Sequence, residues 1–313
     1  MKYNLTSIVI TNYNGKELLK KCIPSVLEAI SYSGRDHEVI LVDDASSDDS
    51  VNFVKKEFSY VKIIPLKENV GFQKASNEGV KQAKNEVVIL LNNDILMEKD
   101  VIDKFLFHFE NESLFSVSAK LFLWDKKTYL AGKREGIFKN GHFFLKDVDE
   151  KSLSYTLFST GGAGAFRKSK FLELGGFDPI YYPLYWEDID ICYRAWKRGY
   201  YSLYDPEILM YHKHRATITK ILTDRKLKII TARNSYIFLW KNITDEKLFL
   251  EHLIFCPLLL FKDLILGESR FIKAFFLALL KFSEILKKRN IEKKNVKLKD
   301  REVLKIHKKL FTR

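Results

Sequence analysis

The chain has 313 residues, of which 46% are hydrophobic and 30% are charged, and its formal net charge at pH 7 is +13. This length allows one large α/β domain with an appendage or two modest domains, and the composition excludes a disordered or collagen-like chain. The positive charge indicates a polyanionic partner, such as nucleic acid, an anionic membrane or a phosphorylated substrate.

Short apolar segments alternate with helical patterns through the first third of the chain. Residues 7–10, 39–42, 61–64 and 87–91 predict strands, and their nearly continuous apolar character is typical of strands buried on both faces of a mostly parallel sheet. Small and apolar residues recur at helical spacing over 72–83. This order predicts an α/β fold built from right-handed βαβ units.

The middle of the chain gives weaker signals. Residues 124–152 are charged and irregular, which is compatible with a hairpin or a mobile loop, so no element is assigned there. The glycine-rich segment 161–164 is either a flexible turn or a place where backbone can approach a sugar or phosphate closely. An aromatic stretch, 181–186, precedes a short helix predicted over 191–198.

The last third of the chain is predicted to be helical, with apolar segments at 248–266 and 271–286. Charged residues and a proline interrupt the first segment, so neither segment has the roughly 20 clean apolar residues that a spanning helix needs. Residues 287–313 contain twelve Lys or Arg and three Asp or Glu. Apolar helices beside such a basic tail favour an in-plane amphipathic anchor on an anionic membrane surface.

Polar clusters follow three of the predicted strands, at 11–15, 43–47 and 92–94. Ligands bind at the carboxyl ends of the strands in an open α/β sheet, so these clusters are candidates for one site. Asp44 could accept hydrogen bonds from a nucleotide base or ribose, or it could belong to an ordinary turn and helix cap. Asp94 could meet a divalent cation and a diphosphate, or it could lie in an asparagine-rich turn.

Two further groups are candidates for chemistry. Glu187 and Asp188 open a helix beside aromatic residues, where they could simply favour the helix dipole or could be desolvated enough to act as a general base. Asp190 could share that work, although on a helix it points some 200° away from Asp188. His212 and His214 are either structural or contacts to a metal or phosphate.

The cysteines and the N-terminus bear on the compartment. Three cysteines lie far apart without metal-ligand spacing, which favours reduced thiols in a cytosolic setting. The first residues enter a predicted strand and lack the features of a signal peptide, so secretion is not expected.

Taken in order, these pieces resemble family 2 glycosyltransferases, in particular a rhamnosyltransferase-like branch that acts in surface-polysaccharide biosynthesis. The resemblance runs over residues 7–217. The motifs that carry it are Ser7-Ile8-Val9-Ile10-Thr11-Asn12-Tyr13-Asn14, Val42-Asp43-Asp44-Ala45-Ser46, Asn69-Val70-Gly71-Phe72 with Asn77, Leu91-Asn92-Asn93-Asp94, Gly175-Gly176-Phe177-Asp178, and Trp186-Glu187-Asp188-Ile189-Asp190 with Arg194 and Gly199.

The resemblance implies a GT-A fold, with a Rossmann-like, mostly parallel sheet flanked by helices and a helical C-terminal extension. It implies inverting transfer of a sugar from a nucleoside-diphosphate sugar to a saccharide or lipid-linked saccharide acceptor. Asp188 would be the general base with Glu187 beside it, and Asp94 with His212 would hold Mg²⁺ or Mn²⁺ on the donor diphosphate. The remaining nucleotide-sugar contacts would be Thr11, Tyr13, Asn14, Asp44, Asn77 and Asn93.

The chain departs from the family pattern at two points. Many relatives have Asp-x-Asp where this chain has Asn92-Asn93-Asp94, which leaves one fewer anionic metal ligand. The Gln-x-x-Arg-Trp signature of processive synthases is absent after the Asp188 helix, so transfer of a single sugar is favoured. The alternatives are a GT-A-like nucleotidyltransferase, for which a basic glycine-rich loop is missing near the N-terminus, and a non-enzymatic basic peripheral membrane protein.

These inferences define the expected organisation. Residues 1–218 would form the catalytic domain, with nucleotide-sugar binding in 1–120 and the acceptor side in 121–218. Residues 219–313 would form a basic helical extension able to associate with a membrane. The protein would be cytoplasmic and peripheral on the inner face of the cytoplasmic membrane, with an anionic lipid surface and no nucleic acid as partner.

Overall fold

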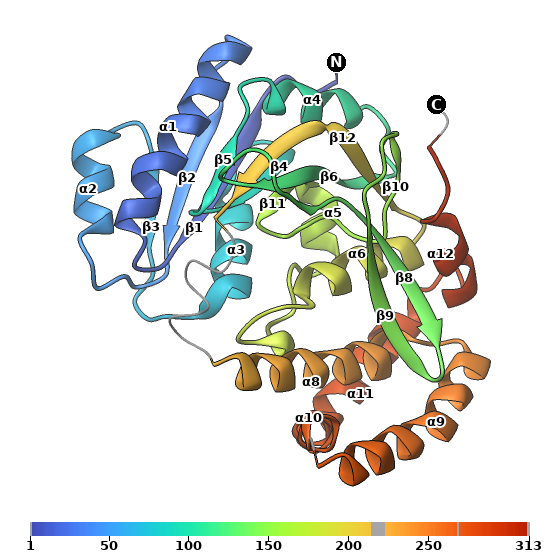
Figure 1. The fold of residues 1–313 in the computed structure, drawn as a ribbon. Coiled ribbons are helices and arrows are strands. Elements are labelled where there is room, and N and C mark those ends of the chain that lie inside the picture. Colours follow the sequence, from blue (N-terminus) through green and yellow to red (C-terminus); the bar gives the residue numbers. More distant parts are fainter. Residues whose placement is uncertain (1, 214–222, 268, 312–313) are drawn as a thin grey trace.

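The computed structural model describes residues 2–213, 223–267 and 269–311. In this part of the chain, a ten-stranded mixed sheet forms the centre of the molecule, in the order β10-β12-β6-β11-β4-β1-β2-β3, with β5 and β7 paired to β12 and β6 (Figure 1). The strands are β1 Thr6–Asn12, β2 Glu38–Asp43, β3 Lys62–Pro65, β4 Val87–Asn92, β5 Ile95–Met97, β6 Leu114–Leu123, β7 Tyr129–Ala131, β10 Ser154–Tyr155, β11 Ala163–Arg167 and β12 Tyr201–His212.

The four strands predicted from sequence are the parallel part of this sheet. β1 pairs in parallel with β2 and β4, and β2 pairs in parallel with β3. Successive residues of β1 enter opposite cores: Ile8 and Ile10 pack on one face and Val9 on the other. Both faces of β1 are therefore buried, and the same burial of β2 and β4 gives these three strands continuous apolar segments, whereas β3 at the sheet edge is only partly buried.

Helices cover both faces of the sheet. α1 Lys16–Ser33 and α4 Val101–His108 contribute to the core on one face, whereas α3 Gly71–Gln82 and α6 Glu187–Lys197 contribute to the core on the other. α2 Ser50–Glu57, α5 Lys168–Glu173 and the 3₁₀ turn η1 Pro179–Tyr181 are short connecting elements. The predicted helix over 191–198 therefore begins four residues earlier, and Glu187 and Asp188 lie in its first turn.

The segment left unassigned, 124–152, contains a two-stranded hairpin made by β8 Lys133–Lys139 and β9 His142–Val148. In Figure 1 the hairpin extends from the sheet toward the C-terminal helices. Its tip contacts α9, where Nδ1 of His252 donates a hydrogen bond to the Gly141 carbonyl at 2.8 Å. Near its middle, the Gly136 amide donates to Nε2 of His307 at 2.9 Å. These partners are more than 100 residues away in sequence, so local patterns gave no sign of them.

The C-terminal third is helical, as predicted, and forms the lower part of the molecule in Figure 1. Its helices are α8 Asp224–Asn242, α9 Glu246–Ile265, α10 Arg270–Leu279, α11 Phe282–Lys294 and α12 Asp300–Ile306. Among the described residues, no helix is both long enough and apolar enough to cross a bilayer. The proposed domain boundary at 218/219 lies outside the described residues.

Two expectations for this region are corrected. The segment 271–286 is not one helix: it breaks after Leu279, and α11 turns back so that the Arg289 guanidinium donates to the carbonyls of Trp240 and Ile243 in and after α8. The basic segment 287–313 is not a free tail over its described part. Asp300 is fully buried and binds the Tyr193 hydroxyl and the Lys197 ammonium of α6. Buried partners of opposite charge hold this segment on the body.

Candidate active site

The loops after β1 and β2 are joined by side-chain hydrogen bonds. Oδ1 of Asn14 accepts from the Ser47 amide at 2.7 Å and from the Asp48 amide at 3.2 Å, and the Asn14 amide donates to the Ser46 hydroxyl. Thr11 lies in register between Val42 and Asn92, and both Thr11 and Tyr13 are half-buried. These contacts hold the two loops side by side at the carboxyl edge of the sheet.

Asp44 fixes the start of α3. Its two carboxylate oxygens accept the amides of Val70 at 2.7 Å and Gly71 at 2.9 Å. Burial raises the pKa of Asp44, and the two amide hydrogen bonds offset part of that rise. Gly71 has φ +81°, and a Cβ there would lie 2.8 Å from the Tyr182 ring, so glycine is required by both conformation and space.

Asp94 and His212 meet at the ends of two different strands. Nε2 of His212, in the last residue of β12, lies 3.2 Å from Oδ2 of Asp94. Asp94 is 6% exposed, and its other oxygen, Oδ1, is buried without a hydrogen-bond donor among the described residues. A buried carboxylate oxygen without a partner fits a cation ligand. Asn93 is instead directed at Asn12, to whose Oδ1 it donates at 2.7 Å.

These two side chains are a partial coordination set. No group of three or more His, Cys, Asp or Glu side chains in the described residues could hold a metal ion alone. A cation at Asp94 would therefore take its remaining ligands from bound substrate and water, as Mg²⁺ commonly does. His214, which the sequence also suggested as a contact, lies outside the described residues.

Glu187 and Asp188 begin α6 and have different surroundings. Glu187 is buried, accepts a hydrogen bond from Nε2 of Gln73 at 3.2 Å, and has a pKa raised to about 8 by burial and by the neighbouring Asp188. Asp188 is half-buried and accepts the amides of Gly161 at 3.1 Å and Ile189 at 2.8 Å. Burial also raises the pKa of Asp188. Backbone amides thus orient the Asp188 carboxylate, and part of the residue stays exposed to solvent.

Short contacts link the carboxylates into one rim. The first turn of α3 contacts two of them, because Gly71 donates to Asp44 and Gln73 donates to Glu187. On the other side, the Asn92 amide at the end of β4 donates to the Gly162 carbonyl, next to the Gly161 amide that holds Asp188. The structure therefore brings the β2, β4 and α6 candidates to the same edge of the sheet.

Asn77 has a different position from the other candidates. Its carboxamide makes two hydrogen bonds to the backbone of Phe177, each at 2.8 Å, so it clamps α3 to the loop that follows α5. A Cβ at Gly176, which has φ +72°, would lie 2.5 Å from Oδ1 of Asn77. Asn77 thus explains the second glycine of the motif, Gly176, and its polar atoms are directed at protein backbone.

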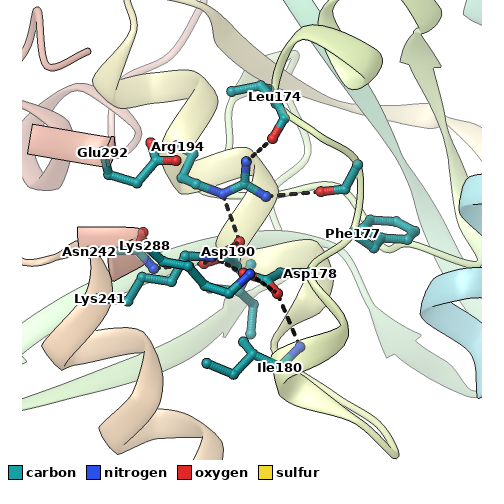
Figure 2. A network of polar contacts seen from close by, with 12 residues as sticks. Leu174, Phe177, Asp178, Ile180, Asp190, Arg194, Lys241, Asn242, Lys288 and Glu292 are labelled. Atoms are coloured by element: carbon teal, nitrogen blue, oxygen red, sulfur yellow. Dashed lines mark hydrogen bonds and ion pairs between the residues drawn. The ribbon is translucent and has the colours of Figure 1, made fainter. Parts of the chain in front are cut away.

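Asp190 lies on the opposite side of α6 from Asp188, within a buried ion network (Figure 2). It accepts hydrogen bonds from Nε of Arg194 at 2.7 Å and from Nζ of Lys241 at 2.9 Å, and Lys241 also contacts Asp178 at 2.6 Å. Burial alone would raise the pKa of Asp190, but Arg194 and Lys241 outweigh it and hold that pKa well below its usual range. Asp190 is committed to structure.

This network ties α6 to the C-terminal helices. Lys241 and Asn242 come from α8, and Lys288 of α11 contacts Asp178 at 3.0 Å. Neither lysine was singled out in the sequence, where a lysine in a basic helical segment reads as a solvated residue. The one sequence feature from which a buried partner could have been expected is the position of Asp190 on the opposite face of its helix from Asp188.

Proteins of similar sequence or structure agree with this architecture. The model of glycosyl transferase family 2 matches residues 7–175, more than half of the chain. Poly-beta-1,6-N-acetyl-D-glucosamine synthase of Staphylococcus aureus (strain COL) is 26% identical over 211 residues, which are 64% of this chain and 48% of that protein. The chain thus spans about half the length of the first such relatives.

Two solved structures are similar in fold. GalNAc-T7 with UDP, GalNAc and Mn²⁺ superposes with a TM-score of 0.62 at 19% identity, over 78% of this chain and 49% of that one. The mannosyltransferase PcManGT from Pyrobaculum calidifontis, in complex with GDP-Man and Mn²⁺, gives 0.54 at 13% identity, over 93% of this chain and 86% of that one. These likenesses support the GT-A fold predicted from the sequence.

Proposed function

Because the chain belongs to glycosyl transferase family 2, we propose that it is an inverting glycosyltransferase that moves one sugar from a nucleoside-diphosphate sugar to the hydroxyl of a saccharide acceptor. The observation that carries the proposal is the rim itself: a half-buried carboxylate, Asp188, lies on the same sheet edge as Asp94, one oxygen of which has no hydrogen-bond donor in the described part of the chain. A displacement needs a base on one side of the sugar and a stabilised diphosphate on the other.

Asp188 is the proposed general base. The Gly161 and Ile189 amides orient its carboxylate, and its raised pKa makes it a stronger proton acceptor than an exposed aspartate. It would take the proton from the acceptor hydroxyl as that oxygen attacks the anomeric carbon. Glu187, with a pKa of about 8, is largely protonated at neutral pH and adds little repulsion against the developing charge.

Asp94 and His212 are the proposed ligands of Mg²⁺ or Mn²⁺. Oδ1 of Asp94, which has no hydrogen-bond partner among the residues that the structure describes, fits a cation, and the neighbouring Nε2 of His212 adds a second ligand atom. When bound, the ion would supply Lewis-acid stabilisation of the departing diphosphate. Solved structures of the same fold contain Mn²⁺ with a nucleotide or nucleotide sugar, which supports this assignment.

The nucleoside part of the donor is proposed to bind across the ends of β1 and β2. Thr11, Tyr13 and Asp44 line this edge, and Asn14 and Asn93 hold its loops in place. Asn77 would act indirectly, by holding α3 against the Phe177 loop.

The acceptor is proposed to be a lipid-linked saccharide in surface-polysaccharide biosynthesis, and the rhamnosyltransferase-like branch stays a prediction. The lipid-linked acceptor is supported by an apolar stripe of α9 that faces solvent, while the opposite side of the helix, including His252 and Cys256, is buried. The stripe residues, each more than half exposed, are Leu250, Leu253, Ile254, Leu258, Phe261, Leu264 and Ile265. Such a face with lysines nearby fits an anionic bilayer surface at the inner side of the cytoplasmic membrane.

On this proposal residues 1–218 perform transfer and residues 219–313 dock the protein on the membrane. Vesicles containing anionic lipid should sediment with the protein at low salt. Leu258→Glu should reduce that binding without loss of fold, because Leu258 is 58% exposed. Deleting 287–313 would not test membrane binding, since this segment supplies buried contacts such as those of Asp300.

The test of the transferase proposal is donor-dependent release of nucleoside diphosphate, measured over a panel of nucleotide sugars. Asp188→Asn should lower turnover by about 10²–10⁴, and a chelator should abolish it. The matched control is Asp36→Asn, an exposed carboxylate just before β2 at the opposite edge of the sheet. Wild-type turnover in Asp188→Asn would show that the base is assigned wrongly.

A further inference from the structure

A groove of about 520 Å³ lies between α8 and α10. It is lined by Lys226, Ile229, Ile230, Ile272, Lys273, Phe276 and Leu277. Its walls are therefore apolar, and the two lysines, one from each helix, line it with their methylene stems and not with their ammonium groups. The volume is within the range of pockets that hold small organic ligands, so the groove is large enough for part of a hydrocarbon chain.

The groove runs along α8 toward the active site. Lys226, Ile229, Ile230 and Arg233 follow the spacing i, i+3, i+4, i+7, which puts them on one face of the helix. Arg233 donates to the Tyr182 carbonyl at 2.6 Å. The stretch from Lys226 to Arg233 covers about 10 Å along the helix axis. One end of the groove is thus within two helical turns of the site loop.

The contact between Arg233 and Tyr182 lies beside the rim of carboxylates described above. The Asn234 carboxamide of α8 donates to the carbonyls of Tyr181, Leu184 and Tyr185, in the loop that leads into Glu187 and Asp188. The Tyr182 ring packs against Gly71, whose amide holds Asp44. A ligand in the groove would therefore reach the site along α8.

The surroundings of the groove identify its occupant. Phe276 and Leu277 are exposed, and the neighbouring Leu280 is 84% exposed, so the apolar lining continues onto the outer surface of α10. An apolar groove open to such a surface fits a hydrocarbon chain. The ammonium groups of Lys226 and Lys273 lie outside this apolar lining, at the ends of the stems that line it, where a phosphate attached to the hydrocarbon chain would meet them. A water-soluble sugar would use neither feature.

We propose that the α8–α10 groove binds the lipid phosphate of the acceptor, with the hydrocarbon chain against Ile230 and Phe276 and the phosphate beside Lys226 and Lys273. This inference rests on the proposed transferase function and adds a carrier subsite to it. The hydrocarbon chain of the acceptor would leave the bilayer beside α10, and the hydroxyl of its sugar would then lie toward Asp188. Surface attachment itself is assigned to the separate stripe on α9.

The experiment uses the full chain and decyl phosphate below its micelle concentration, with binding measured by calorimetry. The variants are Phe276→Glu in the groove and Phe261→Glu on the α9 stripe, which are matched because these side chains are 60% and 62% exposed. We expect Phe276→Glu to weaken decyl phosphate binding by about tenfold or more, Phe261→Glu to leave it within twofold, and uncharged decanol to bind more weakly than decyl phosphate.

Vesicles containing phosphatidylglycerol provide the second arm. Phe261→Glu should weaken vesicle binding while its decyl phosphate affinity is retained. If wild type fails to bind decyl phosphate, or if both variants change its binding equally, the groove assignment is overturned. Because this readout needs no turnover, it is independent of whether donor-dependent diphosphate release is found, which tests the transferase proposal.

Discussion

Asp188 and Asp190 are two residues apart on α6, yet Asp188 is the proposed general base and Asp190 is bound in a buried ion network, and one pair of variants tests this difference. Asp190→Asn keeps the side-chain volume but replaces an oxygen by an amide nitrogen facing the donors of Arg194 and Lys241. Asp190 is fully buried, and it also accepts hydrogen bonds from the Tyr181 hydroxyl and from the side-chain amide of Asn242. The substitution therefore leaves buried cations short of their acceptor.

The expected cost follows from that environment. Breaking a buried ion pair by removing one partner costs about 3–5 kcal/mol, and the lower part of this range applies because Lys241 keeps Asp178 at 2.6 Å. For a chain of this size, each kcal/mol corresponds to about 1.5 °C in Tm, so Asp190→Asn should melt about 5–6 °C lower. Asp188→Asn should leave the free energy of unfolding within about 1 kcal/mol of wild type, because the asparagine oxygen can still accept the Gly161 amide.

The assay is urea unfolding followed by circular dichroism, together with nucleoside diphosphate release on the same samples. Asp190→Asn should lose stability and Asp188→Asn should lose turnover while its fold is intact. Equal stability of Asp190→Asn and wild type would refute the view that this network holds α6 on α8. Destabilisation of Asp188→Asn by the same amount as Asp190→Asn would show that both carboxylates are structural.

Three further predictions concern the donor site, the metal site and pH. Asp44→Asn should lose one of the two amide hydrogen bonds at the start of α3, so the donor KM should rise by about tenfold for a loss of roughly 1.4 kcal/mol; an unchanged KM would argue against nucleotide binding at this edge. Asp94→Asn should raise the Mn²⁺ concentration needed for half-maximal nucleoside diphosphate binding in calorimetry by at least about tenfold, because an anionic ligand is lost; no change would remove Asp94 from the metal site. His307 is buried with its pKa lowered from 6.5 to about 4, so its neutral form stabilises the fold above pH 6.5 and that contribution is lost as pH falls toward 4. The difference in unfolding free energy between wild type and His307→Gln, measured in urea, should fall by about 2 kcal/mol between pH 6.5 and pH 5, and a constant difference would contradict the role given to this ring.

Local patterns in the sequence predicted the half of the molecule that carries the proposed donor site. The strands at β1, β2, β3 and β4 were found within two residues at each end. β1, β2 and β4 leave a continuous apolar signature because they are buried on both faces, whereas β3 is a partly exposed edge strand marked only by a short apolar run. The polar clusters after β1, β2 and β4 were placed at one edge of the sheet because parallel strands end on the same side. The hairpin β8–β9 lacked such a signature, because its strands are only partly buried and their contacts come from α9 and from His307.

What the sequence by itself determined is therefore the parallel sheet, the order of the motifs and the presence of C-terminal helices, because each depends on neighbours within one or two turns of chain. The tertiary structure alone decided that Asp190 pairs with Lys241 while Asp188 stays reachable, and that the apolar stripe of α9 faces outward. It also decided that the basic C-terminal segment is folded onto the body. These features depend on partners 50 to more than 100 residues away, and a charge or an apolar side chain reads the same in sequence whether such a partner covers it or not.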